Sequence, residues 1–373
     1  MGTNDAFSFI TNLIYNNLNN SILTIRTFLD LAKAFDTVNH DILFLKLDRI
    51  GIRGTALDLI KDYLADRYQS VRFQDVTSNL TKVTMGVPQG SILGPLLFIL
   101  YLYLLDMLPD KCIVSYADDT VVFGTAKTWE FARLNMITDL NVIGNWFANN
   151  QLSLNTKKTT FLTFGAYITS IPDDIQIHIN GEFIERASSV KYLGVIMDCH
   201  MRWEEHVKLI LRKTRYLLYV FRKLARFMSG NIMLTIYYAL FHSITNYGIV
   251  AWGGVDNGIL KPLDNLRNRL LKIILYGNRN LKKPLDIKSS FKLQSLSTFY
   301  SEFKKEYTDI NSSTRDKTLV LPKLKINKSL GFKNNYIVAL KCFNSLPNVY
   351  KSLEVKNKKE LKKTLLKSNI FYN

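Results

Sequence analysis

The tetrapeptide Tyr116-Ala117-Asp118-Asp119 places two adjacent carboxylates between two short runs of β-type residues. Residues 112–116 form the first run, and residues 120–123 form the second, which ends at Gly124. This pattern predicts a β-hairpin with an acidic tip. Adjacent exposed carboxylates repel each other and add nothing to a core, so such a hairpin favours cation binding. Aspartate is also common in ordinary turns, and the tetrapeptide alone leaves that alternative open.

A third acid, Asp30, ends another apolar run. Residues 25–30 predict a buried strand that finishes in this carboxylate, and Asn39 is expected to cap the helix that follows. Two strands that each deliver an acid to one end of a sheet can build an oxygen-lined site of the kind that Mg²⁺ prefers. Two such ions about 4 Å apart would activate a 3′-hydroxyl and stabilise a leaving pyrophosphate. Asp36 is interpreted as a helix-start residue rather than a ligand.

Between these acidic segments lies the loop Gly86-Val87-Pro88-Gln89-Gly90-Ser91-Ile92-Leu93-Gly94-Pro95, which precedes an apolar run. Glycines let a backbone approach a ligand closely, and the proline stiffens the loop. Taken alone, the pattern is better explained as a Gly/Pro loop before a buried helix.

Together, and in this order, the segments resemble the reverse transcriptase of non-LTR (LINE-like) retrotransposons, especially the jockey-like group. Residues 28–40 are similar to motif A of that family, residues 86–95 to motif B and residues 116–119 to motif C. Weaker matches follow in the same order, at residues 146–159 for motif D and 192–195 for motif E. The resemblance begins near residue 1 and weakens beyond about residue 280.

The resemblance implies a two-metal active site. Asp30, Asp118 and Asp119 would be its catalytic acids and would hold two Mg²⁺ ions, together with the backbone carbonyl of Leu31. The chemistry is consistent with these residue types, because phosphoryl transfer needs charge neutralisation and alignment more than covalent help.

The resemblance also implies a nucleotide-binding set. Phe35 matches a steric-gate position, where a large ring would clash with a ribose 2′-hydroxyl and so favour deoxynucleotides. Gln89 and Gly90 would shape the floor under the incoming nucleotide, and Lys158 would lie near the pyrophosphate as a general acid. A core phenylalanine and a solvated lysine are the open alternatives for Phe35 and Lys158.

Nucleic-acid contacts are implied at three places. Tyr116 would pack beneath the template–primer, unless it is only a strand aromatic. Tyr192, Leu193 and Gly194 would form the primer grip. A basic helix beyond residue 202 interleaves cations with aromatic rings, which suits a helix that grips a phosphate backbone, although a solvated amphipathic helix is the alternative; its candidate contacts are Lys208, Arg212, Lys213 and Arg215.

Composition bounds the partners and the compartment. The 373 residues carry a net charge of +18, which favours a polyanionic partner. The three cysteines, Cys112, Cys199 and Cys342, are far apart, so we expect no disulfide partner and an intracellular location, in the nucleus or cytoplasm. Cys199, His200 and His206 lack a fourth ligand at a zinc-type spacing. No segment is long and apolar enough to predict membrane insertion.

The order of patterns predicts four regions in an α+β chain. Residues 1–24 would be a residual fingers segment or connecting helix, and residues 25–200 a right-hand polymerase palm of antiparallel strands with helices. Residues 201–280 would be a helical thumb, and residues 281–373 an all-α basic C-terminal region. Because a fingers region and an endonuclease precede motif A in the family, the chain is expected to be truncated at its N-terminus.

Local patterns refine this plan. Thr128 is expected to cap a long helix that ends near residue 149, and Asn180-Gly181 predicts a hairpin turn. One strand is expected over residues 190–197, a packed aromatic turn over residues 247–253 and a loop over residues 309–316.

The function implied by the resemblance is RNA-directed DNA polymerisation, with an RNA template, a DNA primer and deoxynucleoside triphosphates (dNTPs). The alternative is a catalytically impaired, truncated or domesticated remnant that only binds nucleic acid. A helical interaction scaffold is a third hypothesis, and salt-sensitive nucleic-acid binding would count against it.

Overall fold

The computed structural model describes residues 2–103, 113–165, 172, 175–276, 281–313, 333–351, 358–368 and 370–371. The chain divides into two compact units. The sheet unit consists of Leu23–Thr163 and Thr169–Ser188, and the helical unit consists of Met1–Ile22, Phe164–Ile168 and Ser189–Asn373.

The sheet unit is built on six strands in the order β6-β7-β1-β8-β10-β9. Their bounds are Ile113–Tyr116, Asp119–Ala126, Leu23–Leu29, Thr160–Phe164, Glu182–Arg186 and Ile177–Ile179. The pairs β6–β7, β1–β7 and β9–β10 are antiparallel, as predicted, but β10 runs parallel to β8. The expectation of a wholly antiparallel sheet is therefore wrong. The Asn180-Gly181 turn folds β9 back on β10, as predicted, and it is β10 that lies beside β8.

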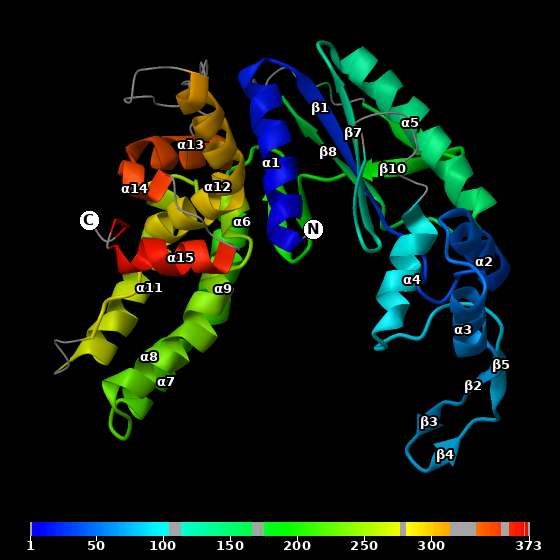
Figure 1. The fold of residues 1–373 in the computed structure, drawn as a ribbon, viewed down its shortest axis with the longest axis horizontal. Coiled ribbons are helices and arrows are strands. Elements are labelled where there is room, and N and C mark those ends of the chain that lie inside the picture. The colour runs from blue at the N-terminus through cyan, green and yellow to red at the C-terminus, as the bar shows by residue number, and fades with distance from the viewer. Residues whose placement is uncertain are drawn as a thin grey trace. The chain divides into compact units, whose positions relative to one another are not determined.

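In the described part of the sheet unit, four helices accompany this sheet: α2 (His40–Arg49), α3 (Thr55–Leu64), α4 (Leu93–Leu102) and α5 (Trp129–Asn149). Both predicted caps are confirmed, since the Asn39 side chain accepts from the Ile42 amide and Thr128 accepts from the Phe131 amide. The long helix α5 packs against β7, β1 and β9 and so covers one face of the sheet (Figure 1). Its buried side chains join those of the strands, α2 and α4 in one hydrophobic core.

Strand β7 continues through Gly124, where the sequence predicted its end. A Cβ atom at Gly124 would lie 2.7 Å from the Ala132 carbonyl oxygen and 2.7 Å from the Met136 Cβ. The glycine therefore allows α5 to approach the strand closely rather than breaking it.

An exposed arm leaves the sheet unit between α3 and α4 (Figure 1). It consists of β2 (Arg67–Gln69), β3 (Arg72–Phe73), β4 (Val76–Thr77) and β5 (Thr81–Val83), with β2 paired to β5 and β3 paired to β4. All four strands are short. All but the innermost residues of the arm are exposed, so little packing exists to extend them.

The helical unit begins with α1 (Thr3–Asn19) and the hairpin β11 (Ser189–Tyr192) and β12 (Val195–Asp198). The hairpin corrects the single strand expected over residues 190–197. Leu193 and Gly194 adopt positive φ angles of 44° and 83°, which makes them a two-residue turn.

Among the described residues, the remaining regular structure of the helical unit is α-helical except for the π-helical turn Tyr238–His242. Its helices are α6 (Glu204–Thr214), α7 (Leu217–Leu224), α8 (Gly230–Tyr237), α9 (Ser243–Asn246), α10 (Ile249–Trp252), α11 (Asn257–Leu275), α12 (Ile287–Ser313), α13 (Asn335–Ser345), α14 (Asn348–Lys351) and α15 (Lys358–Lys367). The loop expected over residues 309–316 is wrong up to Ser313, where α12 ends, and its remainder lies outside the described residues.

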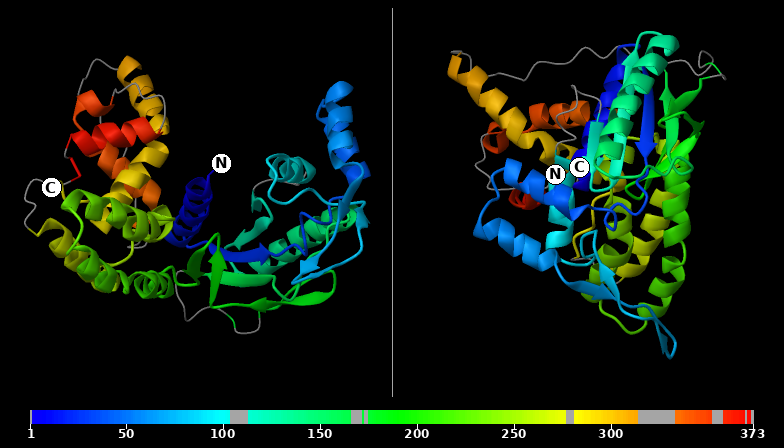
Figure 2. Two further views of the ribbon diagram at one scale, coloured as in Figure 1. Left: turned by 90° about the horizontal axis from the view of Figure 1, so that it is seen from below. Right: turned by 90° about the vertical axis from the view of Figure 1, so that its right-hand side faces the viewer.

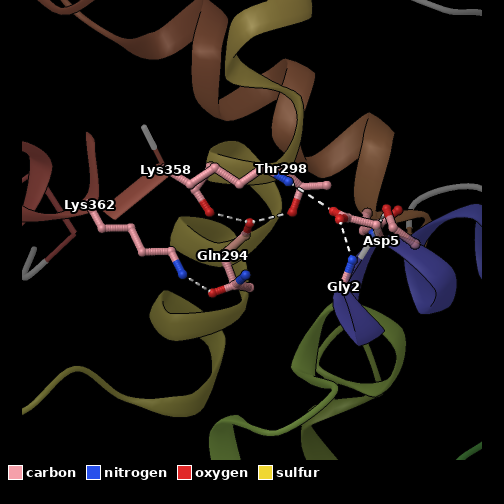
Figure 3. Close-up of polar contacts among 9 residues, drawn as sticks. Gly2, Asp5, Gln294, Thr298, Lys358 and Lys362 are labelled. Carbon is pink, nitrogen blue, oxygen red and sulfur yellow. Dashed lines mark hydrogen bonds and ion pairs between the residues drawn. The ribbon is translucent and has the colours of Figure 1, made fainter. Parts of the chain in front are cut away.

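Helices α12, α13 and α15 pack together around a second core (Figure 2). Polar contacts tie this core to the start of the chain (Figure 3). Lys358 on α15 forms an ion pair of 2.8 Å with Asp5 on α1, and Lys362 donates to Gln294 on α12. Across the part of the chain that the structure describes, no helix combines the length and the apolar character needed to cross a membrane.

Candidate active site

The pairing of β1 with β7 brings the predicted acids to one end of the sheet. Leu29 lies opposite Thr120 in this ladder, so Asp30 and Asp119 are the next residues of their strands at the same end. Asp119 also pairs with Tyr116 across the β6–β7 hairpin, which leaves Ala117 and Asp118 as its two-residue turn. Ala117 has a positive φ of 54°, as such a tight turn requires. The predicted acidic hairpin is confirmed.

The three carboxylates influence one another electrostatically. Partial burial raises the pKa of the Asp119 carboxyl above its usual value, and the charges of Asp118 and Asp30 raise it further. Negative charge is therefore concentrated at this end of the sheet, and a bound cation would relieve it.

The donor atoms fit a hard cation that also binds substrate. Within the described residues, no group of three or more His, Cys, Asp and Glu side chains is arranged to hold a metal ion by itself. Mg²⁺ typically takes only one or two carboxylates, with water and substrate phosphates completing its shell. Asp30 and Asp118, with the Leu31 carbonyl, could supply that partial set.

The local pairing of Leu31 does not use its own carbonyl. Leu31 forms an isolated antiparallel bridge with Leu154. The bridge uses the Asp30 carbonyl, which accepts from the Asn155 amide at 2.8 Å, and the Ala32 amide, which donates to the Ser153 carbonyl at 2.8 Å. It therefore does not occupy the carbonyl of Leu31 itself.

Thr159 completes a backbone clamp on Asp30. Its hydroxyl accepts from the Asp30 amide at 3.2 Å and donates to the Asn155 carbonyl at 3.0 Å. Both backbone polar groups of Asp30 are thus hydrogen-bonded to residues 155–159. These bonds fix the backbone position from which the Asp30 side chain extends. Sequence analysis selected the neighbouring Lys158, whose side chain is exposed, and did not predict this role of Thr159. A threonine that follows two lysines has no sequence feature that would indicate a hydrogen bond to Asp30.

The glycine loop is joined to the segment after Asp30. The Gly86 amide donates to the Val38 carbonyl at 2.7 Å, and the Val87 amide donates to the Phe35 carbonyl at 2.8 Å. Gly86 has a φ of +83°, and a Cβ atom there would lie 2.8 Å from the Asp36 backbone. Only glycine fits this approach, so the loop is more than a spacer before α4.

Gln89 and Asp36 form a direct contact that the sequence did not predict. The Gln89 amide donates to the Asp36 carboxylate at 2.9 Å. Asp36 thus orients Gln89, in addition to lying before α2. Gly90 has a φ of +79° and open space around it, so its backbone is accessible beside Gln89.

Phe35 stacks on Phe98 of α4, with ring centroids 4.5 Å apart, and it is only partly buried. Partial burial is consistent with both interpretations of this ring, as a core residue and as a steric gate. Tyr116 is likewise half-buried at the end of β6.

The predicted primer-grip residues belong to the helical unit. Tyr192 is buried and packs edge-on against Phe7 of α1. The Leu193 carbonyl accepts from the Tyr247 hydroxyl at 2.7 Å. The Tyr247 carbonyl in turn accepts from the buried Trp252 ring at 3.0 Å, so the packing expected over residues 247–253 is confirmed. The turn expected there is wrong, because Ile249–Trp252 form the short helix α10.

The basic residues of α6 lie on its exposed side. A row of residues begins on α6 with residues 208 and 212 and reaches its C-cap, residue 215. At the same helical spacing it continues with residues 219 and 222 of α7 and with residue 226, which follows that helix. All six side chains are exposed, while His206, Val207 and Ile210 face the core. Lys213 is exposed beside this row, and Lys208 also pairs with Glu204 at 3.6 Å.

Cys199 and Cys342, the cysteines among the described residues, show no feature of a catalytic or metal-binding thiol. The Cys199 sulfur lies 3.6 Å from the His200 ring nitrogen Nε2, and burial raises the pKa of the Cys342 thiol to about 11. Cys112 lies outside the described residues. Burial lowers the pKa of His206 to about 4, and its Nδ1 accepts from the Ile196 amide, as in a core histidine.

The clamp on Asp30 predicts a stability loss. Thr159→Val keeps the side-chain shape but removes the acceptor of the partly buried Asp30 amide. The free energy of unfolding, measured with urea, should fall by about 1–3 kcal/mol. Thr159→Ser keeps the hydroxyl and should retain most of the stability, whereas equal stability of the valine variant and wild type would contradict the clamp.

The raised pKa of Asp119 predicts a pH-dependent gain. The folded state binds a proton on this group more readily than the unfolded state, so its contribution to stability falls as pH rises above 3.8. Asp119→Asn should therefore stabilise the metal-free protein at pH 7, and the gain should shrink as pH falls towards 3.8. Urea unfolding at several pH values tests this, with the distant Asp75→Asn as control; a gain that is independent of pH would contradict it.

Comparison with known proteins places this site in a family. Residues 4–197 match the family model described as reverse transcriptase (RNA-dependent DNA polymerase). The RNA-directed DNA polymerase from mobile element jockey of Drosophila melanogaster is 26% identical over 326 residues, covering 81% of this chain and 34% of that protein. The probable RNA-directed DNA polymerase from transposon X-element of the same species is 27% identical over 256 residues, covering 66% and 28%.

The chain is also similar to a polymerase from a second Drosophila species and to a solved structure. The jockey polymerase of Drosophila funebris is 29% identical over 243 residues, covering 60% of this chain and 26% of that protein. A telomerase structure from Candida albicans aligns with a TM-score of 0.35 at 14% sequence identity, covering 84% of this chain and 52% of that chain. The chain spans about a quarter to a third of the length of these curated relatives. The chain belongs to the reverse transcriptase family, and its similarity to the jockey and X-element polymerases confirms the predicted resemblance to jockey-type non-LTR retrotransposon reverse transcriptases.

Proposed function

We propose that the chain carries the RNA-directed DNA polymerase activity of a jockey-type non-LTR element. It would extend the 3′-hydroxyl of a DNA primer with dNTPs on an RNA template. The observation that carries the proposal is the meeting of Asp30, Asp118 and Asp119 at one end of the β1–β7 pair, in a chain of this family. In this proposal residues 25–200 are the palm, residues 201–280 are the thumb and residues 281–373 are a basic C-terminal region. The protein would be intracellular, in the nucleus or cytoplasm.

The metal site follows from the donor chemistry. Asp30 and Asp118 would hold two Mg²⁺ ions, with help from Asp119 and the Leu31 carbonyl. When bound, these ions would lower the pKa of the primer hydroxyl and neutralise the charge of the leaving pyrophosphate.

The chain's own residues would bind and orient the nucleotide. Asp36 fixes the Gln89 amide, so Gln89 and Gly90 present a set surface to the base and sugar. Phe35, held by its stack on Phe98, would exclude a ribose 2′-hydroxyl. The exposed Lys158 would donate a proton to the pyrophosphate as it leaves.

The proposed nucleic-acid contacts include residues of the sheet unit and residues of the helical unit. Tyr116 would pack under the template–primer, and Tyr192, Leu193 and Gly194 would position the primer end. The exposed row on α6 and α7 suits a phosphate backbone, because its cations and Tyr219 are exposed together. The proposed phosphate contacts are Lys208, Arg212 and Arg215 of this row and Lys213 beside it.

The test is Mg²⁺-dependent incorporation of dNTPs on a primed RNA template. Asp118→Ala, Asp119→Ala should abolish incorporation, because both removed carboxylates belong to the metal site. The control double variant Asp58→Asn, Asp62→Asn removes two exposed acids of α3 and should stay active. No incorporation by wild type would contradict the proposed activity of this chain.

The role of Phe35 predicts a change in sugar selectivity. Phe35→Val removes the ring, so the ratio of kcat/KM for a dNTP to that for the matching ribonucleotide should fall at least tenfold, about 1.4 kcal/mol of discrimination. Single-nucleotide incorporation measures this ratio. The control Phe98→Leu disturbs the same stack without touching the gate, and an equal loss of selectivity in both variants would favour the core interpretation.

A further inference from the structure

A groove of about 680 Å³ runs along the C-terminal half of α11, entirely within the helical unit. None of the proposed catalytic, primer-grip or phosphate-contacting residues lines it. Its lining residues are Asn265, Asn268, Arg269, Leu271, Lys272, Leu275, Tyr276 and Lys283.

The groove is cationic and its lining contains no acid. Arg269 and Lys272 project from exposed positions of α11, and Lys283 faces them from the segment that precedes α12. The neighbouring hollow, which shares Asn268 and Lys283, does contain acids, namely Asp264 and Asp286. The absence of acid is therefore a property of this groove and not of the whole surface.

The buried side chain of Arg267 supports the groove from the interior of the helical unit. Arg267 is 4% exposed and donates to the Pro284 carbonyl, which ties the segment bearing Lys283 to α11. It also donates to the Asn268 side-chain oxygen at 3.2 Å. Because that oxygen is engaged, the Asn268 side chain offers its amide N–H groups as donors.

We propose that this groove binds single-stranded nucleic acid. Arg269, Lys272 and Lys283 would contact phosphates, and the Tyr276 ring, which is 88% exposed, would stack on a base. A cationic groove beside an exposed aromatic ring is the combination that sequence-tolerant single-strand binding uses. An inorganic anion or an acidic peptide would need only the cations for binding. The exposed aromatic ring beside them favours a ligand that also has a nucleobase. The inference shares with the proposed function only its nucleic-acid partner and does not depend on polymerase activity.

The test measures binding without catalysis. A fluorescein-labelled single-stranded RNA is titrated with the full chain at several salt concentrations, with EDTA and without dNTPs. Lys272→Gln should lower the slope of log affinity against log salt by about 0.7 and weaken binding roughly fivefold at 0.1 M salt. The matched control is Lys261→Gln, because Lys261 is an exposed lysine of the same helix outside the groove.

Tyr276 provides the second arm. Tyr276→Ala should weaken binding roughly fivefold or more, while Tyr276→Phe keeps the ring and should bind like wild type. Equal effects of Lys272→Gln and Lys261→Gln, or an alanine variant that binds like wild type, would overturn the proposal. If the expected pattern appears in a chain that extends no primer, the groove stands and the polymerase proposal fails. Circular dichroism of each variant checks that the helices remain folded.

Discussion

The antiparallel ladder between β1 and β7 is the interaction on which the candidate site depends. It sets Asp30 level with the β6–β7 hairpin, whose two-residue turn carries Asp118. A shift of one residue in this register would turn every side chain of β1 to the opposite face. Ile25 and Leu29 are buried on this strand, so the register that packs the core is also the register that gathers the acids.

Gathering like charges opposes folding, and the surrounding backbone holds them in place. The clamp from residues 155–159 fixes Asp30 from one side, while residues 86–87 bind the backbone of the segment that follows it. Motif A is therefore held by hydrogen bonds from two segments distant in sequence. Family resemblance marks those segments as motifs B and D, and the hydrogen bonds give a physical reason for their presence beside the acids.

Much of this arrangement could be predicted from sequence because it depends on local patterns. The hairpin tips at Asp118 and Asn180, the cap at Asn39 and the acid at the end of β1 each follow from a few adjacent residues. Gly124 could not be interpreted correctly from its neighbours in sequence. A glycine is needed there because α5 approaches the strand closely, and that contact depends on the tertiary structure. Thr159 and Asp36 were missed for the same reason, since their partners lie 129 and 53 residues away. The parallel pairing of β8 with β10 is likewise decided by packing across the sheet.

The central claim is that the strand ends of β1 and β7 form one metal site, and metal-directed cleavage tests it most directly. Fe²⁺ replaces Mg²⁺ in the presence of dNTP and primed template, and ascorbate with peroxide generates radicals that cut the chain beside the bound ion. The account predicts two groups of cuts, one near Asp30 and one near Asp118 and Asp119, and both should disappear when excess Mg²⁺ is added. Cuts at only one of these strands, or at neither, would contradict it.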